Sequence, residues 1–190
     1  TVPEDASEAW YVVQDNITLN SSRLKIKGNI NLILTDGCTL DAKSGIHVPV
    51  GSSLTIYGQS GKTGTVKANG YGSHAGIGGN DGSYGNITIN GGIIEAVSKS
   101  GGAGIGGGMN TAADAKVGKI VINGGTVTAK GGESGYGGGA GIGGGYYGKG
   151  EVEINGGIIT ATGGNSGAGI GGGCYSWENN DKEYSGKSII

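Results

Sequence analysis

The 190-residue sequence has no Phe, only two Pro and two Cys, a single Arg, and few aromatic residues overall (6%). Charged residues are also scarce at 15%, and they nearly balance, with 13 Lys and Arg against 15 Asp and Glu. This balance excludes the basic surface that a nucleic-acid-binding protein needs, and a polybasic membrane attachment as well. No apolar run reaches the ~18 to 20 residues of a membrane span, so we expect no membrane insertion.

Glycine is the abundant residue: with 47 of 190 positions it excludes an ordinary helical domain. The glycines are ordered. The string AGIGG occurs at residues 75–79, 103–107, 140–144 and 168–172, and INGG lies between these copies at 89–92, 122–125 and 154–157. The chain therefore repeats a unit of about 32 residues, which is typical of a solenoid.

The stretches between the glycine motifs alternate apolar and polar residues over three to five positions, which predicts short strands. Equivalent apolar residues of successive units align in columns. One column holds Leu32, Leu54, Ile87, Ile120 and Val152, the next Leu34, Ile56, Ile89, Ile122 and Ile154, and the third strand supplies Ile46, Ile77, Ile105, Ile142 and Ile170. The sequence thus predicts an all-β fold, a right-handed parallel β-helix with three strands per coil and about five complete coils.

The two ends of the chain differ from the repeats. Residues 1–30 are less regular, and we expect an N-terminal capping coil there, with the β-helix occupying 31–190. The Gly-x-x-x-Ile start of each unit returns at 186–190, so the chain ends as a further coil begins. We expect further domains of the same polypeptide beyond this end, or a partner or the 174–185 loop covering it.

Two structural details follow from stacking. The Asn residues of the three INGG copies are placed to form a ladder of side-chain amides: Asn90, Asn123 and Asn155. Cys38 and Cys174 are about four coils or ~19 Å apart, which exceeds the ~7 Å Cα separation that a disulfide allows. We expect two free thiols.

Motifs for chemistry are weak in this sequence. The run from Gly102 to Gly107 matches the dinucleotide fingerprint, but no helical periodicity follows it, and residues 78–82 resemble a calcium-binding repeat in one copy only. The seven Asp are scattered, the single Arg23 lies in the cap, and His47 and His74 are expected as neighbours on adjacent coils. We find no convergent carboxylates, and therefore expect no catalytic residues, no metal and no cofactor.

The aromatic residues are the remaining candidates for binding. A group of them follows the AGIGG segments, in loops that should line one side of the solenoid: Tyr84, Tyr146, Tyr147, Tyr175 and Trp177. Flat rings with a polar group suit stacking on sugars, so we predict a ligand-binding role for these five residues. The alternative is that the rings pack on one another and shield the glycine-rich backbone.

The stretch WYVVQDNITLNSSRLKIKGNINLILTDGCTLDAKSGIHV, together with SLTIYGQS and the AGIGGG repeats, resembles large secreted or cell-surface proteins of gut Gram-positive bacteria. Those proteins carry pectin-lyase-like β-helix regions, often beside adhesion or wall-anchoring modules. The resemblance implies the fold and a secreted or bacterial cell-surface location. It supplies no functional residues.

Three functions remain open at this point. The first is an extracellular non-catalytic module that binds a polysaccharide or host glycan, or adheres, through the aromatic loops. The second is a passive spacer within a larger surface protein. The third is a polysaccharide lyase or glycoside hydrolase.

Overall fold

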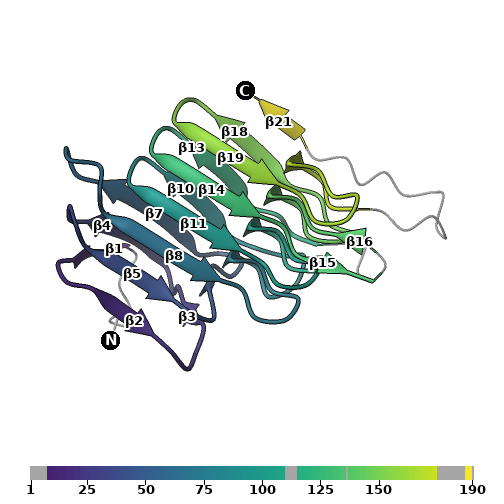
Figure 1. Cartoon of the computed structure of the whole chain (residues 1–190), viewed down its shortest axis with the longest axis horizontal. Helices are drawn as coiled ribbons and strands as arrows, with labels where there is room; N and C mark the ends of the chain where they lie inside the picture. Colours follow the sequence, from purple (N-terminus) through teal and green to yellow (C-terminus); the bar gives the residue numbers. More distant parts are fainter. Residues whose placement is uncertain (1–7, 110–114, 136, 175–186, 190) are drawn as a thin grey trace.

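The computed structural model describes residues 8–109, 115–135, 137–174 and 187–189. These residues form a right-handed parallel β-helix, whose coils follow one another along a single axis from the N-terminal to the C-terminal end (Figure 1). Every strand of the three long sheets pairs in parallel with its equivalent one coil away. No helix long and apolar enough to cross a membrane occurs within these ranges.

Three sheets, called A, B and C here, run the length of the solenoid. Sheet A contains β1 (Glu8–Val13), β4 (Asn29–Leu34), β7 (Ser53–Gly58), β10 (Asn86–Ile89), β13 (Lys119–Ile122), β18 (Glu151–Ile154) and β21 (Lys187–Ile189). Sheet B contains β2 (Ile17–Leu19), β5 (Thr39–Ala42), β8 (Thr65–Asn69), β11 (Ile93–Val97), β14 (Thr126–Lys130) and β19 (Ile158–Thr162). Sheet C contains β3 (Leu24–Lys25), β6 (Ile46–His47), β9 (Ile77–Gly78), β12 (Ile105–Gly106), β17 (Ile142–Gly143) and β20 (Ile170–Gly171). A short antiparallel hairpin, β15 (Glu133–Ser134) and β16 (Gly137–Gly138), branches from the fifth coil.

The first coil is more complete than expected. Strands β1, β2 and β3 pair residue by residue with β4, β5 and β6, so residues 8–25 lie in the same three sheets as the rest. The described chain therefore has six coils rather than five. The sequence did not predict the first as a complete coil, because its short apolar stretches lack the glycine motifs of the later coils. At the other end β21 pairs with β18, with Lys187 opposite Glu151, which is the register expected from the motif at 186–190.

The predicted columns are confirmed from the third coil onward, and one alignment is wrong. Leu54 lies opposite Ile30 rather than Leu32, and Ile56 lies opposite Leu32 rather than Leu34. A slip of two residues keeps the same side chains pointing inward, so alternation alone does not reveal it. Strands β4 and β7 pair over six residues, so the inward Leu34 lies opposite Gly58.

The third strand of each coil explains the AGIGGG motif. Ile77, Ile105 and Ile142 are fully buried and stack directly on one another. The next residue of each strand is a glycine with positive φ, and at Gly106 a Cβ would lie 2.0 Å from the carbonyl oxygen of Gly143. Only glycine permits this backbone conformation together with the close approach of the coils.

Candidate functional site

Two of the five predicted aromatic residues lie inside the protein. The side chains of Tyr84 and Tyr146 are 1% and 3% exposed, and Tyr84 belongs to the hydrophobic core. Burial accordingly raises the pKa of the Tyr84 hydroxyl. In this structure neither ring offers a face for a sugar to stack on, so the expected exposed row of loop aromatics is not formed at these two positions.

Tyr147 is partly exposed and packs edge-to-face against Tyr146, with the ring centroids 4.2 Å apart and the planes at 60°. This contact is the alternative described above, in which neighbouring rings pack on one another over glycine-rich backbone. A Cβ at Gly137 would lie 2.6 Å from the Tyr146 ring, so the glycine makes room for it. Tyr175 and Trp177 lie outside the described residues, and their binding role stays a prediction.

A different pair of aromatic side chains lies on the outer surface of sheet A. Trp10 of β1 and Tyr57 of β7 stack with centroids 5.4 Å apart and an angle of 25° between the rings. Trp10 is 56% exposed, and the neighbouring Val12 is exposed as well. These residues are 47 positions apart in the sequence, and the coiling of the chain brings them together.

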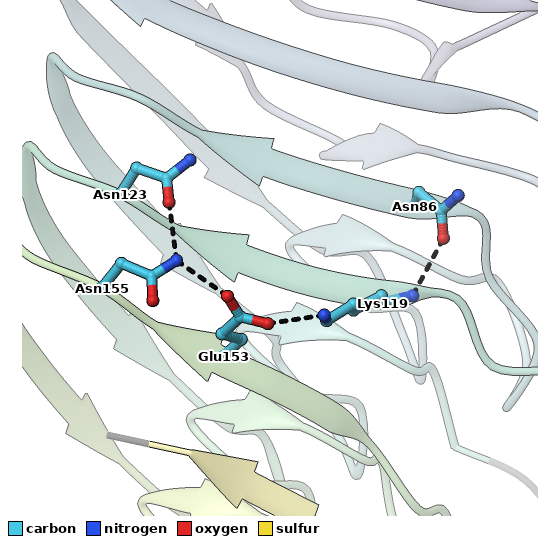
Figure 2. Close-up of polar contacts among 5 residues, drawn as sticks. All are labelled: Asn86, Lys119, Asn123, Glu153 and Asn155. Atoms are coloured by element: carbon cyan, nitrogen blue, oxygen red, sulfur yellow. Dashed lines mark hydrogen bonds and ion pairs between the residues drawn. The ribbon is translucent and has the colours of Figure 1, made fainter.

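The asparagine ladder lies in the same row as Tyr57. Asn90 follows Ile89, which pairs with Ile56, so Asn90 is the neighbour of Tyr57 one coil further along. The Nδ2 of Asn155 donates to Oδ1 of Asn123, and the Nδ2 of Asn123 donates to Oδ1 of Asn90, each at 2.8 Å. The predicted amide ladder is thus confirmed, and Figure 2 shows the hydrogen bond between Asn155 and Asn123.

Charged groups are fixed in place at the C-terminal part of this surface. Glu153 accepts a hydrogen bond from Nδ2 of Asn155 at 2.9 Å, and its other carboxylate oxygen lies 2.5 Å from Nζ of Lys119 (Figure 2). The contact with Lys119 is the main cause that lowers the pKa of Glu153, and Glu153 in turn raises the pKa of Lys119. Both groups are therefore charged at neutral pH.

We call the outer surface of sheet A that these residues form the sheet A face; its members are Trp10, Tyr57, Asn90, Asn123, Glu153 and Asn155. It combines a partly exposed aromatic pair, which supplies a stacking surface, with a row of amides, which supply hydrogen-bonding groups. A groove of about 380 Å³ adjoins the ladder. Its lining is mostly glycine, with the following other residues: Gln59, Lys62, Asn90, Thr126 and Ile158.

An ion pair also forms on another face of the solenoid. On sheet B, Glu95 forms an ion pair of 3.3 Å with Lys67, which lies in register between Glu95 and Asp41. The sequence analysis did not predict this row of Asp41, Lys67 and Glu95. Within the described residues no group of three or more His, Cys, Asp or Glu is placed to hold a metal ion. Cys38 and Cys174 are not joined in a disulfide, as expected.

Comparison with known proteins identifies the repeat. A model of the family described as beta helix repeat matches residues 60–83, 87–109, 120–146 and 152–174. No curated protein and no solved structure matches the chain. The four matched segments make up just over half of the sequence, and each falls within one coil of the solenoid. The chain belongs to the β-helix repeat family.

Proposed function

We propose that this β-helix repeat protein is an extracellular, non-catalytic module that binds a polysaccharide or host glycan through the sheet A face. The observation that carries the proposal is the stack of the exposed Trp10 on the partly exposed Tyr57, which lies in line with the amide ladder. Aromatic rings present an apolar face to the C–H groups of a sugar ring, while side-chain amides donate to and accept from its hydroxyls. The sheet A face offers both within one flat surface.

The length of the surface favours a polymer over a single sugar. Strands of a sheet lie about 4.8 Å apart, so the surface from Trp10 on the first coil to Asn155 on the sixth extends about 24 Å. Several sugar rings of an extended chain fit along such a surface. Over the last three coils the amides repeat, so successive rings there meet the same chemical groups.

The state of the carboxylates supports binding rather than catalysis. A general acid needs a raised pKa, so that it holds a proton at working pH. Lys119 and Asn155 instead lower the pKa of Glu153. Glu95 is held by Lys67 on another face of the solenoid.

The test compares binding by the chain and by a variant in which Trp10→Ala and Tyr57→Ala are combined. Polysaccharides are screened on a glycan array, and the best binder is then titrated by calorimetry. Each ring is worth about 0.5–1.5 kcal/mol, or about 2- to 12-fold in affinity. Val50→Ala is the control, because Val50 is an exposed apolar residue that belongs to neither the sheet A face nor any other proposed site. Binding that survives the double variant, or that is lost equally in the control, contradicts the assignment of the sheet A face.

A passive spacer is the second candidate, favoured by the continuous apolar core and the amide ladder, both of which stiffen the solenoid along its axis. A passive spacer predicts that neither the parent protein nor the Trp10→Ala and Tyr57→Ala variant binds a glycan on the array. The third function, a polysaccharide lyase or glycoside hydrolase, predicts release of reducing ends or unsaturated uronates from pectin. We propose neither as the main role.

A further inference from the structure

Basic side chains gather on a second surface, away from sheet A. They lie on the outer side of sheet C and on the corner between sheets B and C, over the first four coils. We call this surface the basic strip; its members are Arg23, Lys25, His47, His74 and Lys99. With strands about 4.8 Å apart, Lys25 on the first coil and Lys99 on the fourth are about 14 Å apart along the axis.

The register of sheet C aligns the first members of the strip. Lys25 of β3 lies opposite His47 of β6, and both point outward because the preceding residues, Leu24 and Ile46, point to the core. His74 lies on the next coil, in the loop before β9, close enough for its charge to act on His47. The predicted proximity of the two histidines is therefore confirmed.

Arg23 supplies a fixed positive charge beneath these side chains. Its Nη1 donates to the carbonyl oxygen of Ser44 and its Nη2 to that of Ile46, both at 3.0 Å. Gly45 makes room for the guanidinium, since a Cβ there would lie 2.3 Å from Nη1. Burial lowers the pKa of Arg23 to about 10, so the group remains cationic at neutral pH.

An exposed aromatic ring stands at the other end of the strip. Tyr71 is 68% exposed, and Nζ of Lys99 lies 5.8 Å from its ring centroid, within the range of a cation–π contact. The backbone N–H of His74 donates to the carbonyl oxygen of Tyr71 at 3.2 Å, so the two residues share one turn. The strip thus joins positive charge to a ring face on which a sugar can stack.

The two histidines make the charge of the strip depend on pH. Burial is the largest cause that lowers the pKa of each, and the charge of Arg23 comes next. Lys25 also lowers the pKa of His47, while the carboxylate of Asp81 acts in the opposite direction on both. Both imidazoles are therefore neutral at pH 7.5, and they gain protons only as the pH falls below the ordinary value of about 6.5.

We propose that the basic strip binds the sulfate groups of a sulfated polysaccharide, at a site separate from the sheet A face, and that this binding strengthens in mildly acidic solution. A carboxylate is best recognised by the planar fork of a free guanidinium, but the Nη groups of Arg23 already donate to backbone carbonyls. The accessible groups are ammonium and imidazole, which act as point charges and suit a tetrahedral anion. Several of them in a line suit a polymer that carries repeated charges.

The experiment measures binding of dextran sulfate, neutral dextran and polygalacturonate by calorimetry at pH 7.5 and 5.5, at one low ionic strength. We expect dextran sulfate to bind and dextran not to bind, with tighter binding at pH 5.5. Combining Lys25→Gln and Lys99→Gln removes two charge contacts of about 0.2–1 kcal/mol each, a loss of about 2- to 30-fold. Combining His47→Gln and His74→Gln removes the strengthening between the two pH values. Circular dichroism checks that each variant is folded.

Two controls separate this site from others. Lys62→Gln removes an exposed lysine from the corner between sheets A and B, away from the strip, and should leave the affinity unchanged. The Trp10→Ala and Tyr57→Ala variant should also bind dextran sulfate normally, whether or not the proposed function of the sheet A face holds. No binding of dextran sulfate, or equal binding by the lysine variant, overturns the site. Tighter binding of polygalacturonate than of dextran sulfate overturns the assignment of sulfate.

Discussion

Replacing Ile105 by Ala tests the stacked core at its centre. Ile105 is fully buried and lies between Ile77 and Ile142, its equivalents on the neighbouring coils. Truncating a buried Ile to Ala removes contacts on both sides and leaves a cavity, which costs about 2–5 kcal/mol. For a chain of this length, 1 kcal/mol corresponds to about 2–4 °C in melting temperature. We therefore expect thermal unfolding, followed by circular dichroism, to shift downward by about 4–20 °C.

Ile170→Ala provides the matched control. Ile170 occupies the same position on the sixth coil but is only partly buried. Its strand, β20, is the last described strand of sheet C, so no further described strand of that sheet packs on its C-terminal side. Its truncation should lower the melting temperature by less than half as much as that of Ile105. Equal shifts in the two variants, or a negligible shift in Ile105→Ala, would refute the reasoning that burial by stacking stabilises each coil.

Three further changes have distinct expected results. Gly106→Ala should lower the melting temperature by at least several degrees, because its Cβ would clash with the Gly143 carbonyl at 2.0 Å, whereas Gly135→Ala, with open space around it, should have little effect. Asn123→Ala removes the middle of the amide ladder, and chemical denaturation should show a loss of about 1–2 kcal/mol. Asp36 accepts hydrogen bonds from the backbone of Thr63 and Gly61, and these lower its pKa. A lowered carboxyl pKa stabilises the fold above about pH 3.9, and this contribution is lost as the pH falls through the folded-state pKa. Asp36→Asn should therefore reduce the melting temperature at pH 7 and converge with the parent protein in acid; a constant difference across that range would contradict the assignment.

The repetitive part of the fold could be predicted from the sequence. Each AGIGG copy contains a strand of sheet C, each INGG copy marks the turn from sheet A to sheet B, and the inward residues between them keep a period of two. The first coil lacks those motifs, and its short apolar stretches show no regular period. Its strand pairing could therefore not be predicted from the sequence. The two-residue slip at Leu54 has the same origin, because register between two strands depends on strand length and loop geometry as well as on alternation.

The candidate binding surface was predictable only where it repeats. An Asn recurs in every INGG copy, so stacking alone predicts the hydrogen bonds of the amide ladder. Trp10 and Tyr57 each occur once, two coils apart, and no sequence pattern links them. The burial of Tyr84 was equally hidden, because the direction in which a loop side chain points depends on the shape of the return loop rather than on its place in the repeat.

The most direct test of the central claim, that equivalent residues lie above one another from coil to coil, is a disulfide introduced across β14 and β19. Thr128 and Thr160 are exposed and paired in register, about 4.8 Å apart, a separation that a disulfide can span. In a background that carries Cys38→Ser and Cys174→Ser, oxidation of the Thr128→Cys and Thr160→Cys variant should give a crosslink, detected by mass spectrometry after proteolysis. Pairing Thr128→Cys with Thr162→Cys, about 8 Å apart, should give little. Crosslinking that favours the second pair would contradict the stacked register.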